Sequence, residues 1–159
     1  MEEKKLTITY KEYASLDEME PGDRALVEAA DDARKGSYSP YSKFQVGAAL
    51  RLVDGTIIKG ANQENAAYPS GLCAERTAMF YAGANHPGVP FDTLAIIASD
   101  HGEVCEYPAT PCGSCRQVMA EYQRLGGRPL KIILAGKLKI MKFEKLDDIM
   151  PFVFTSLKA

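Results

Sequence analysis

Several residue types and patterns are scarce in this chain of 159 residues, and each absence excludes a class of protein. No apolar run approaches the roughly 20 residues that span a membrane, and the first 20 residues lack the apolar core of a signal peptide. The net charge is −2 without any dense cluster of Lys and Arg, which disfavours a nucleic-acid-binding face. We therefore expect a cytoplasmic protein with neither a membrane nor a nucleic-acid partner.

Histidine and cysteine are also scarce, which narrows the kinds of metal site. The two histidines, His86 and His101, do not form an H-x-x-x-H pattern. Four cysteines in a reducing compartment argue against a disulfide framework and favour metal binding or catalysis. A zinc site in this chain would therefore depend on thiolate ligands.

The remaining composition is typical of a soluble globular protein, with 46% hydrophobic and 25% charged residues. Residues 1–20 are charged and show no clear period, so we interpret them as an N-terminal extension in which "TITYKEY" is a candidate edge strand. Residues 21–159 have the length of one compact domain that buries a core without disulfides.

Helical and strand patterns alternate along this domain. A helical pattern follows Pro21, and Asp54-Gly55 is typical of a tight turn between two strands. The order predicts a layered α/β domain in which helices cover a mixed sheet of about five strands. The predicted strands are "FQVGAALRLV", "TIIKGAN", "TLAIIAS", "LKIILAG" and "KLKIMKF"; the later predicted helices are "CAERTAMFYAGAN", "CGSCRQVMAEYQRL" and the short "EKLDDIM".

The stretch "TPCGSCRQ" carries Cys112 and Cys115 in a C-x-x-C pair that alone fits a redox couple, half of a structural zinc site, or part of a catalytic one. Cys73 also stands at a predicted helix start, where the helix N-terminus favours the thiolate. Three ligands leave one position open for water, which is typical of a catalytic zinc. Cys105 lies seven residues before Cys112, outside the usual ligand spacing, and we interpret it as a loop or core thiol.

Two charged residues follow Cys73 at informative spacings. Glu75, at i+2, points away from the ligand direction and is free to take a proton from a zinc-activated water. Arg76, at i+3, shares the face of Cys73, where a guanidinium would offset the negative charge of three thiolates. Arg116 follows Cys115 directly and is a second candidate for this role, although its helical position is less favourable than that of Arg76.

The motifs "CAER" and "PCGSCR" resemble those of the zinc-dependent cytidine deaminases. The resemblance extends through "YSPYSKFQVGAAL" and "NQENAAY" and covers about residues 37–123. It implies a three-layer α/β/α sandwich with one zinc per chain. The three cysteine ligands, Cys73, Cys112 and Cys115, resemble the small homotetrameric branch of the family.

The resemblance also implies a reaction and its substrate contacts. Water would replace the amine of cytidine or 2′-deoxycytidine, giving uridine or 2′-deoxyuridine and ammonia in pyrimidine salvage. Phe44 would stack on the base, and Asn62 and Glu64 would hydrogen-bond the ribose hydroxyls. Glu75 would contact the base and shuttle protons, while the Ala74 N–H would read the base edge.

Active sites of this family are shared between subunits, which implies that Tyr68 and Phe154 reach a neighbouring site. Phe154 is the less direct of the two matches, because Val153 stands where the family usually has a small residue.

Three rival functions remain open at this stage. A related deaminase could act on another base or nucleoside, although Phe44, Asn62 and Glu64 favour the ordinary one. A nucleic-acid-editing enzyme would need a basic groove and aromatic platforms. A non-enzymatic zinc module would have no need of Glu75. Without the flanking motifs, Phe44 would be read as a core residue, and Asn62 and Glu64 as an ordinary polar loop.

Overall fold

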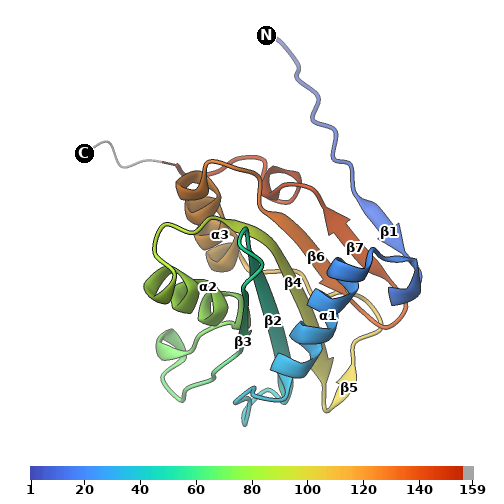
Figure 1. Cartoon of the computed structure of the whole chain (residues 1–159), viewed down its shortest axis with the longest axis vertical. Helices are drawn as coiled ribbons and strands as arrows, with labels where there is room; N and C mark the ends of the chain where they lie inside the picture. The colour runs from blue at the N-terminus through green and yellow to red at the C-terminus, as the bar shows by residue number, and fades with distance from the viewer. Residues whose placement is uncertain (156–159) are drawn as a thin grey trace.

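A single mixed sheet organises the computed structural model, which describes residues 1–155 (Figure 1). The sheet is seven-stranded with the order β1-β7-β6-β4-β2-β3, and β5 pairs with β4. Among the described strands only β4 and β6 run parallel, joined by a helical crossover, and the other neighbours are antiparallel. The strands are β1 (Lys11–Tyr13), β2 (Phe44–Leu52), β3 (Ile57–Ala61), β4 (Phe91–Asp100), β5 (Glu103–Val104), β6 (Lys131–Ala135) and β7 (Ile140–Phe143).

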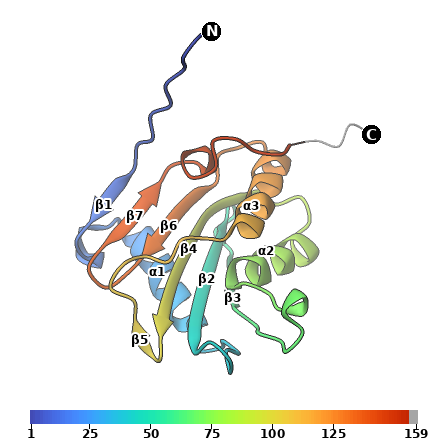
Figure 2. The same cartoon turned by 180° about the vertical axis from the view of Figure 1, so that it is seen from behind.

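Helices cover both faces of this sheet, so the expected three-layer α/β/α sandwich is confirmed. Helix α1 (Pro21–Arg34) lies on one face, and α2 (Ala74–Asn85) and α3 (Gly113–Gly126) lie on the other (Figures 1 and 2). Strand alternation divides the core accordingly. In β2, Ala48, Leu50 and Leu52 pack beneath α2 and α3, whereas Ala49 packs beneath α1.

The five predicted strands are all present, and two short ones add to them. Strand β1 falls within the predicted edge-strand candidate. Strand β5 is new: a turn with positive φ at His101 and Gly102 folds two residues back onto β4, too few for a periodic signal. The predicted short helix near the C-terminus is a single 3-10 turn, Leu146–Asp148. None of the described helices has the length and apolarity to cross a membrane.

A buried ion cluster joins α1 to the sheet. Asp23, in the first turn of α1, accepts hydrogen bonds from Lys142 of β7 at 2.6 Å and from Arg51 of β2 at 3.0 Å. Burial opposes the charged carboxylate, but these hydrogen bonds hold the pKa of Asp23 below its ordinary value. The cluster therefore depends on an ionised Asp23.

Glycine allows α2 to lie directly against β3. A Cβ at Gly60 would stand 2.5 Å from the Ala74 carbonyl oxygen and 2.6 Å from the Ala78 nitrogen. The absent side chain at Gly60 therefore sets how closely the beginning of α2 approaches the sheet. Because Ala74 follows Cys73, this packing also sets the position of one cysteine.

Candidate metal centre and active site

Two helix N-termini meet at the cysteines. Cys73 is the N-cap of α2 and Cys112 is the N-cap of α3. Cys115 follows in the first turn of α3 and is fully buried. Since helix N-termini carry partial positive charge, both helices favour thiolate at this point. Helix α3 ends at Gly126, and Gly127 adopts the left-handed conformation that caps it.

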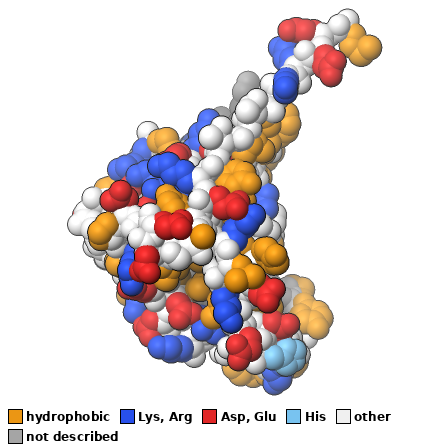
Figure 3. Space-filling view, turned by 90° about the vertical axis from the view of Figure 1, so that its right-hand side faces the viewer, with side chains coloured by type: hydrophobic (Ala, Val, Ile, Leu, Met, Phe, Trp, Pro, Cys, Tyr) orange, Lys and Arg blue, Asp and Glu red, His pale blue; other side chains and the backbone are white. Residues whose placement is uncertain are grey.

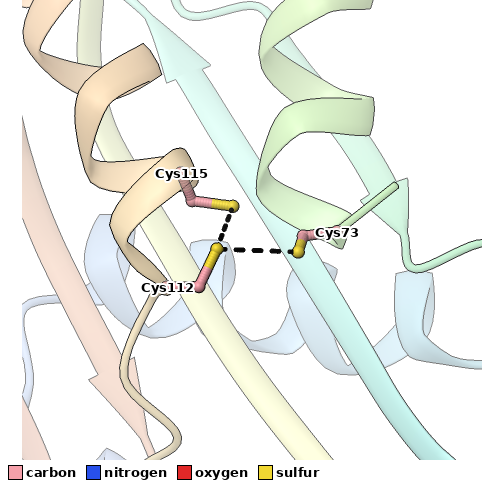
Figure 4. A group of neighbouring side chains, drawn as sticks. All are labelled: Cys73, Cys112 and Cys115. Atoms are coloured by element: carbon pink, nitrogen blue, oxygen red, sulfur yellow. Dashed lines mark hydrogen bonds between the residues drawn. The ribbon is translucent and has the colours of Figure 1, made fainter. Parts of the chain in front are cut away.

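The three sulfurs converge on one point, as Figure 4 shows. The Sγ atoms of Cys73 and Cys112 are 3.9 Å apart, and those of Cys112 and Cys115 are 3.5 Å apart. All three lie within 4.8 Å of one another. Cys105 is outside this group and is a half-buried free thiol.

Two of the three thiols, those of Cys73 and Cys115, have pKa values that are shifted in opposite directions. A hydrogen bond from Cys115, with the Arg76 guanidinium, lowers the pKa of Cys73 to about 5 against the opposing effect of burial. The same hydrogen bond and burial raise the pKa of Cys115. Three thiolates at this separation need a bound cation to offset their repulsion. Zinc, a dication that prefers thiolate ligands, fits this donor set.

Arg76 supplies positive charge on the α2 side of the centre. Its Nη2 donates to Cys73 Sγ at 3.6 Å. Its Nε is buried without a hydrogen-bond partner among the described residues. Because an unpaired buried donor is costly, the guanidinium favours further negative charge in its surroundings.

Glu75 lies in the first turn of α2, between Cys73 and Arg76 in the chain. Its side chain is 4% exposed, although the first turn of a helix is an ordinary place for a solvated carboxylate. Burial raises the pKa of the Glu75 carboxyl above its ordinary value. A buried carboxyl beside a three-thiolate centre is suited to proton transfer.

Comparison with known proteins identifies the family to which this cysteine centre belongs. Residues 21–125 match the model of the cytidine and deoxycytidylate deaminase zinc-binding region. The cytidine deaminase of Halalkalibacterium halodurans is 41% identical over 133 residues, which cover 82% of this chain and 92% of that protein. That of Sporosarcina psychrophila is 50% identical over 98 residues, 61% of this chain and 67% of that protein. The chain belongs to the zinc-binding cytidine deaminase family.

Solved structures of cytidine deaminases agree with this membership. The crystal structure from Burkholderia pseudomallei superimposes with a TM-score of 0.68 at 43% identity, covering 82% of this chain and 97% of that one. The structure from Mycobacterium tuberculosis gives a TM-score of 0.64 at 35% identity, covering 83% and 96%. The zinc prediction is confirmed: in this deaminase the zinc-binding cluster is Cys73, Cys112 and Cys115.

The loop before β2 folds around Asn62. Asn62 Oδ1 accepts hydrogen bonds from Ser37 Oγ at 2.5 Å and the Val46 N–H at 2.8 Å, while Nδ2 donates to the Phe44 carbonyl at 2.9 Å. Ser37 is a participant that sequence reasoning did not identify, since 25 residues separate it from Asn62. The Asn62 side chain thus fixes the start of β2 in this deaminase.

The side chain of Glu64 binds the backbone of the same loop. Its Oε2 accepts hydrogen bonds from the backbone N–H groups of Tyr41, at 2.9 Å, and Ser42, at 3.3 Å. Hydrogen bonds from Ser42 and Tyr41 lower the pKa of Glu64 despite partial burial. The carboxylate is therefore ionised and half-buried beside Asn62.

The remaining predicted contact residues lie in different surroundings. Phe44 begins β2 and by alternation shares the face of Val46 and Ala48, which is the face of α2. Ala74 is the first residue of α2 and is fully buried. Tyr68 is 82% exposed and Phe154 is 64% exposed. These last two side chains therefore extend away from the core of their own chain.

Two neighbours in α3 hold the C-terminal segment. Arg116 donates from Nε to the Pro111 carbonyl at 2.9 Å and from Nη1 to the Ile149 carbonyl at 2.6 Å. Gln117 Nε2 donates to the Phe154 carbonyl at 2.8 Å. Arg116 thus binds backbone carbonyls, and the helix that carries Cys115 also anchors the segment that carries Phe154. Nothing in the local sequence pattern signals this contact.

Proposed function

We propose that this chain hydrolyses cytidine and 2′-deoxycytidine to uridine and 2′-deoxyuridine with release of ammonia. The observation that carries the proposal is the buried Glu75, which lies two residues after the ligand Cys73 and in the same helical turn as Arg76. A purely structural zinc module has no use for a buried carboxyl beside its ligands.

Cys73, Cys112 and Cys115 would hold the metal. Zinc, when bound, supplies the Lewis acidity that makes water a nucleophile at neutral pH. Arg76, whose Nη2 lies 3.6 Å from Cys73 Sγ, withdraws charge from that sulfur. Such withdrawal keeps a centre with three thiolates acidic enough for hydrolysis.

Glu75 is proposed to move the protons of the reaction. It takes one proton from the attacking water and gives it to N3 of the base, then takes the second proton from the hydroxyl formed on C4 and delivers it to the amine, which departs as ammonia. The Ala74 N–H, at the first position of α2, is suited to bind an acceptor on the base edge. Both groups belong to one rigid helical turn, which holds their relative positions during turnover.

Phe44, Asn62 and Glu64 are proposed to hold the nucleoside. The Phe44 ring offers a face for stacking on the pyrimidine. The ionised Glu64 accepts hydrogen bonds from hydroxyl donors, and Asn62 holds the backbone of Phe44 in place through its contacts with the Val46 N–H and the Phe44 carbonyl. We propose the sugar hydroxyls as the ligands of this polar pair.

A homotetramer with shared active sites follows from the same proposal. Tyr68 and Phe154 are aromatic side chains with large exposed fractions, which suits residues that contact a neighbouring subunit. The anchoring of the Phe154 backbone by Gln117 supports a fixed role for this residue. We also propose a cytoplasmic location and a role in pyrimidine salvage.

A panel of substrates tests the reaction. The zinc-loaded protein is incubated with cytidine, 2′-deoxycytidine, cytosine, adenosine, dCMP and a cytidine-containing oligonucleotide, and ammonia release is measured. We expect turnover of the first two only. Turnover of dCMP or the oligonucleotide in preference to both nucleosides would contradict the proposal.

The Glu75→Gln variant tests the proton-transfer role with nearly unchanged side-chain volume. We expect it to retain about one zinc per chain and to lose at least about 100-fold in kcat. Glu103→Gln, at an exposed position of β5, serves as the matched control and should keep full activity. Full activity of Glu75→Gln would refute the assigned role.

A further inference from the structure

The first ten residues form an extended arm that leaves the body of the molecule. In Figures 1 and 2 this arm continues from β1, at the edge of the sheet, and projects away from the helices. Among the described residues, β1 pairs only with β7, through Lys11–Tyr13. The arm precedes residues 21–125, which match the family model, so family membership assigns it no role.

Every second residue of the arm and β1 lies on one face of the extended chain. Leu6, Ile8 and Tyr10 are 58%, 47% and 44% exposed, although all three are apolar or aromatic. The Tyr10 ring packs on Phe143 with 5.3 Å between ring centroids, so this face continues the face of the sheet that carries α3. Figure 3 shows charged side chains together with a hydrophobic one at the tip, and further hydrophobic side chains nearer the body. The full row on this face is Lys4, Leu6, Ile8, Tyr10 and Glu12.

This row is complementary to itself when two copies run antiparallel. With Ile8 at the two-fold axis, Ile8 lies opposite the partner's Ile8, and Leu6 lies opposite the partner's Tyr10. Lys4 then lies opposite the partner's Glu12, so each end of the row forms a pair of opposite charges. Directly opposed side chains of this kind stabilise antiparallel strands.

Neighbouring registers lose this complementarity. With Thr7 on the axis, Lys4 lies opposite the partner's Tyr10 and Glu12 lies opposite the partner's Glu2. With Thr9 on the axis, Leu6 lies opposite the partner's Glu12. The row of side chains therefore specifies one register, as expected where one face of a strand becomes buried.

The other face of the arm is compatible with this register. Thr7 lies opposite the partner's Thr9, a pair that antiparallel strands accept. Lys5 lies opposite the partner's Lys11, but in its own chain Lys11 Nζ is 3.3 Å from Glu144, which offsets the positive charge. The open outer edge of β1 supplies the backbone groups for pairing.

We propose that residues 4–12 pair with the same segment of a second copy of this chain, antiparallel about a two-fold axis at Ile8. The pairing joins the two sheets through β1 of each subunit and covers Leu6, Ile8 and Tyr10. It goes beyond the proposed reaction and does not depend on it. Because the arm contributes no residue to the metal centre, activity per chain and arm pairing are measured separately.

Cysteine cross-linking tests the register in the zinc-loaded full-length chain. Under mild oxidation with copper phenanthroline, Ile8→Cys should give a disulfide-linked dimer on a non-reducing gel. Leu6→Cys and Tyr10→Cys should not cross-link alone but should cross-link when mixed, and the unsubstituted chain is the background control. A cross-link of Leu6→Cys with itself, or none with Ile8→Cys, would overturn the proposal.

Charge exchange tests the two outer pairs. Sedimentation at several concentrations measures the association of the unsubstituted chain and of a variant that lacks residues 2–10. The association that the shortened variant loses is the association through the arm. Lys4→Glu should weaken this association by at least about fivefold, because two attractive pairs become repulsive. Adding Glu12→Lys should restore it, although it also breaks the 3.0 Å contact of Glu12 with Lys139. Equal association of the unsubstituted chain, Lys4→Glu and the shortened variant would refute the pairing, whatever the deaminase activity.

Discussion

Gly60 offers the sharpest test of how packing sets the metal centre. A Cβ placed there would stand 2.5 Å from the Ala74 carbonyl oxygen, whereas ordinary contacts begin at 3.4 Å. Gly60→Ala therefore requires the beginning of α2 to move by about 0.9 Å from β3. Because Cys73 is the N-cap of α2, its sulfur moves with the helix.

We expect this movement to lower both the stability and the activity of the protein. Overpacking a well-packed site costs about 1–3 kcal/mol, which lowers Tm by about 2–12 °C for a chain of this length. Zinc–sulfur distances tolerate only about 0.2 Å of error, so the site should bind less than one zinc per chain. Misplacement of a reacting group by about 1 Å costs on the order of 100-fold in kcat/KM.

The assay compares Gly60→Ala with Gly113→Ala. A Cβ at Gly113 meets no atom within 4 Å, although this residue directly follows the ligand Cys112. Zinc content, Tm and kcat/KM should stay near the unsubstituted values in Gly113→Ala and fall in Gly60→Ala. If Gly60→Ala kept all three values, close packing of α2 on β3 would not set the position of Cys73.

Two further predictions concern contacts distant from the cysteines. Arg116→Met leaves two backbone carbonyls without their charged donor and should lower the free energy of unfolding, measured in urea, by about 2–3 kcal/mol. The control Arg124→Met removes a surface ion pair and should lower it by less than about 1 kcal/mol. Equal losses in the two variants would contradict the anchoring role of Arg116. Asp23→Asn should cost about 3 kcal/mol at pH 7 because Lys142 loses its buried partner. Since the folded-state pKa of Asp23 is lowered, this difference should be full above about pH 4 and disappear as the pH falls through the folded-state pKa; a difference unchanged at pH 2 would refute the ionised pair.

Local patterns in the sequence were sufficient for much of the fold. The alternating pattern of residues 44–52 predicts a strand, and the structure buries both faces of this strand against different helices. Two-residue strands such as β5 leave no periodic signal. The 3-10 turn at Leu146–Asp148 differs from the predicted helix because so short a segment forms too few hydrogen bonds to offset the cost of helix nucleation.

The zinc ligands were also predictable, because both ligand stretches are helix starts with informative spacing. Cys73 and Cys112 act as N-caps, and Cys115 lies one turn beyond Cys112. The burial of Glu75 was not readable from spacing, since a carboxylate in the first turn of a helix is ordinarily solvated. The roles of Tyr68 and Phe154 stay predictions that depend on a neighbouring subunit.

By itself, the sequence determined the order of elements, the helix starts and the residue types that bind zinc, because each depends on neighbours within a few residues. Only the tertiary structure decided how these segments meet. It brought Cys73 within 3.9 Å of Cys112 across 39 residues, joined Ser37 to Asn62, and turned Arg116 toward the Ile149 carbonyl. Such contacts depend on the angle and distance at which the helices pack on the sheet. This packing is set by contacts between residues far apart in the chain, such as the close approach of α2 to β3 that the missing Cβ of Gly60 allows.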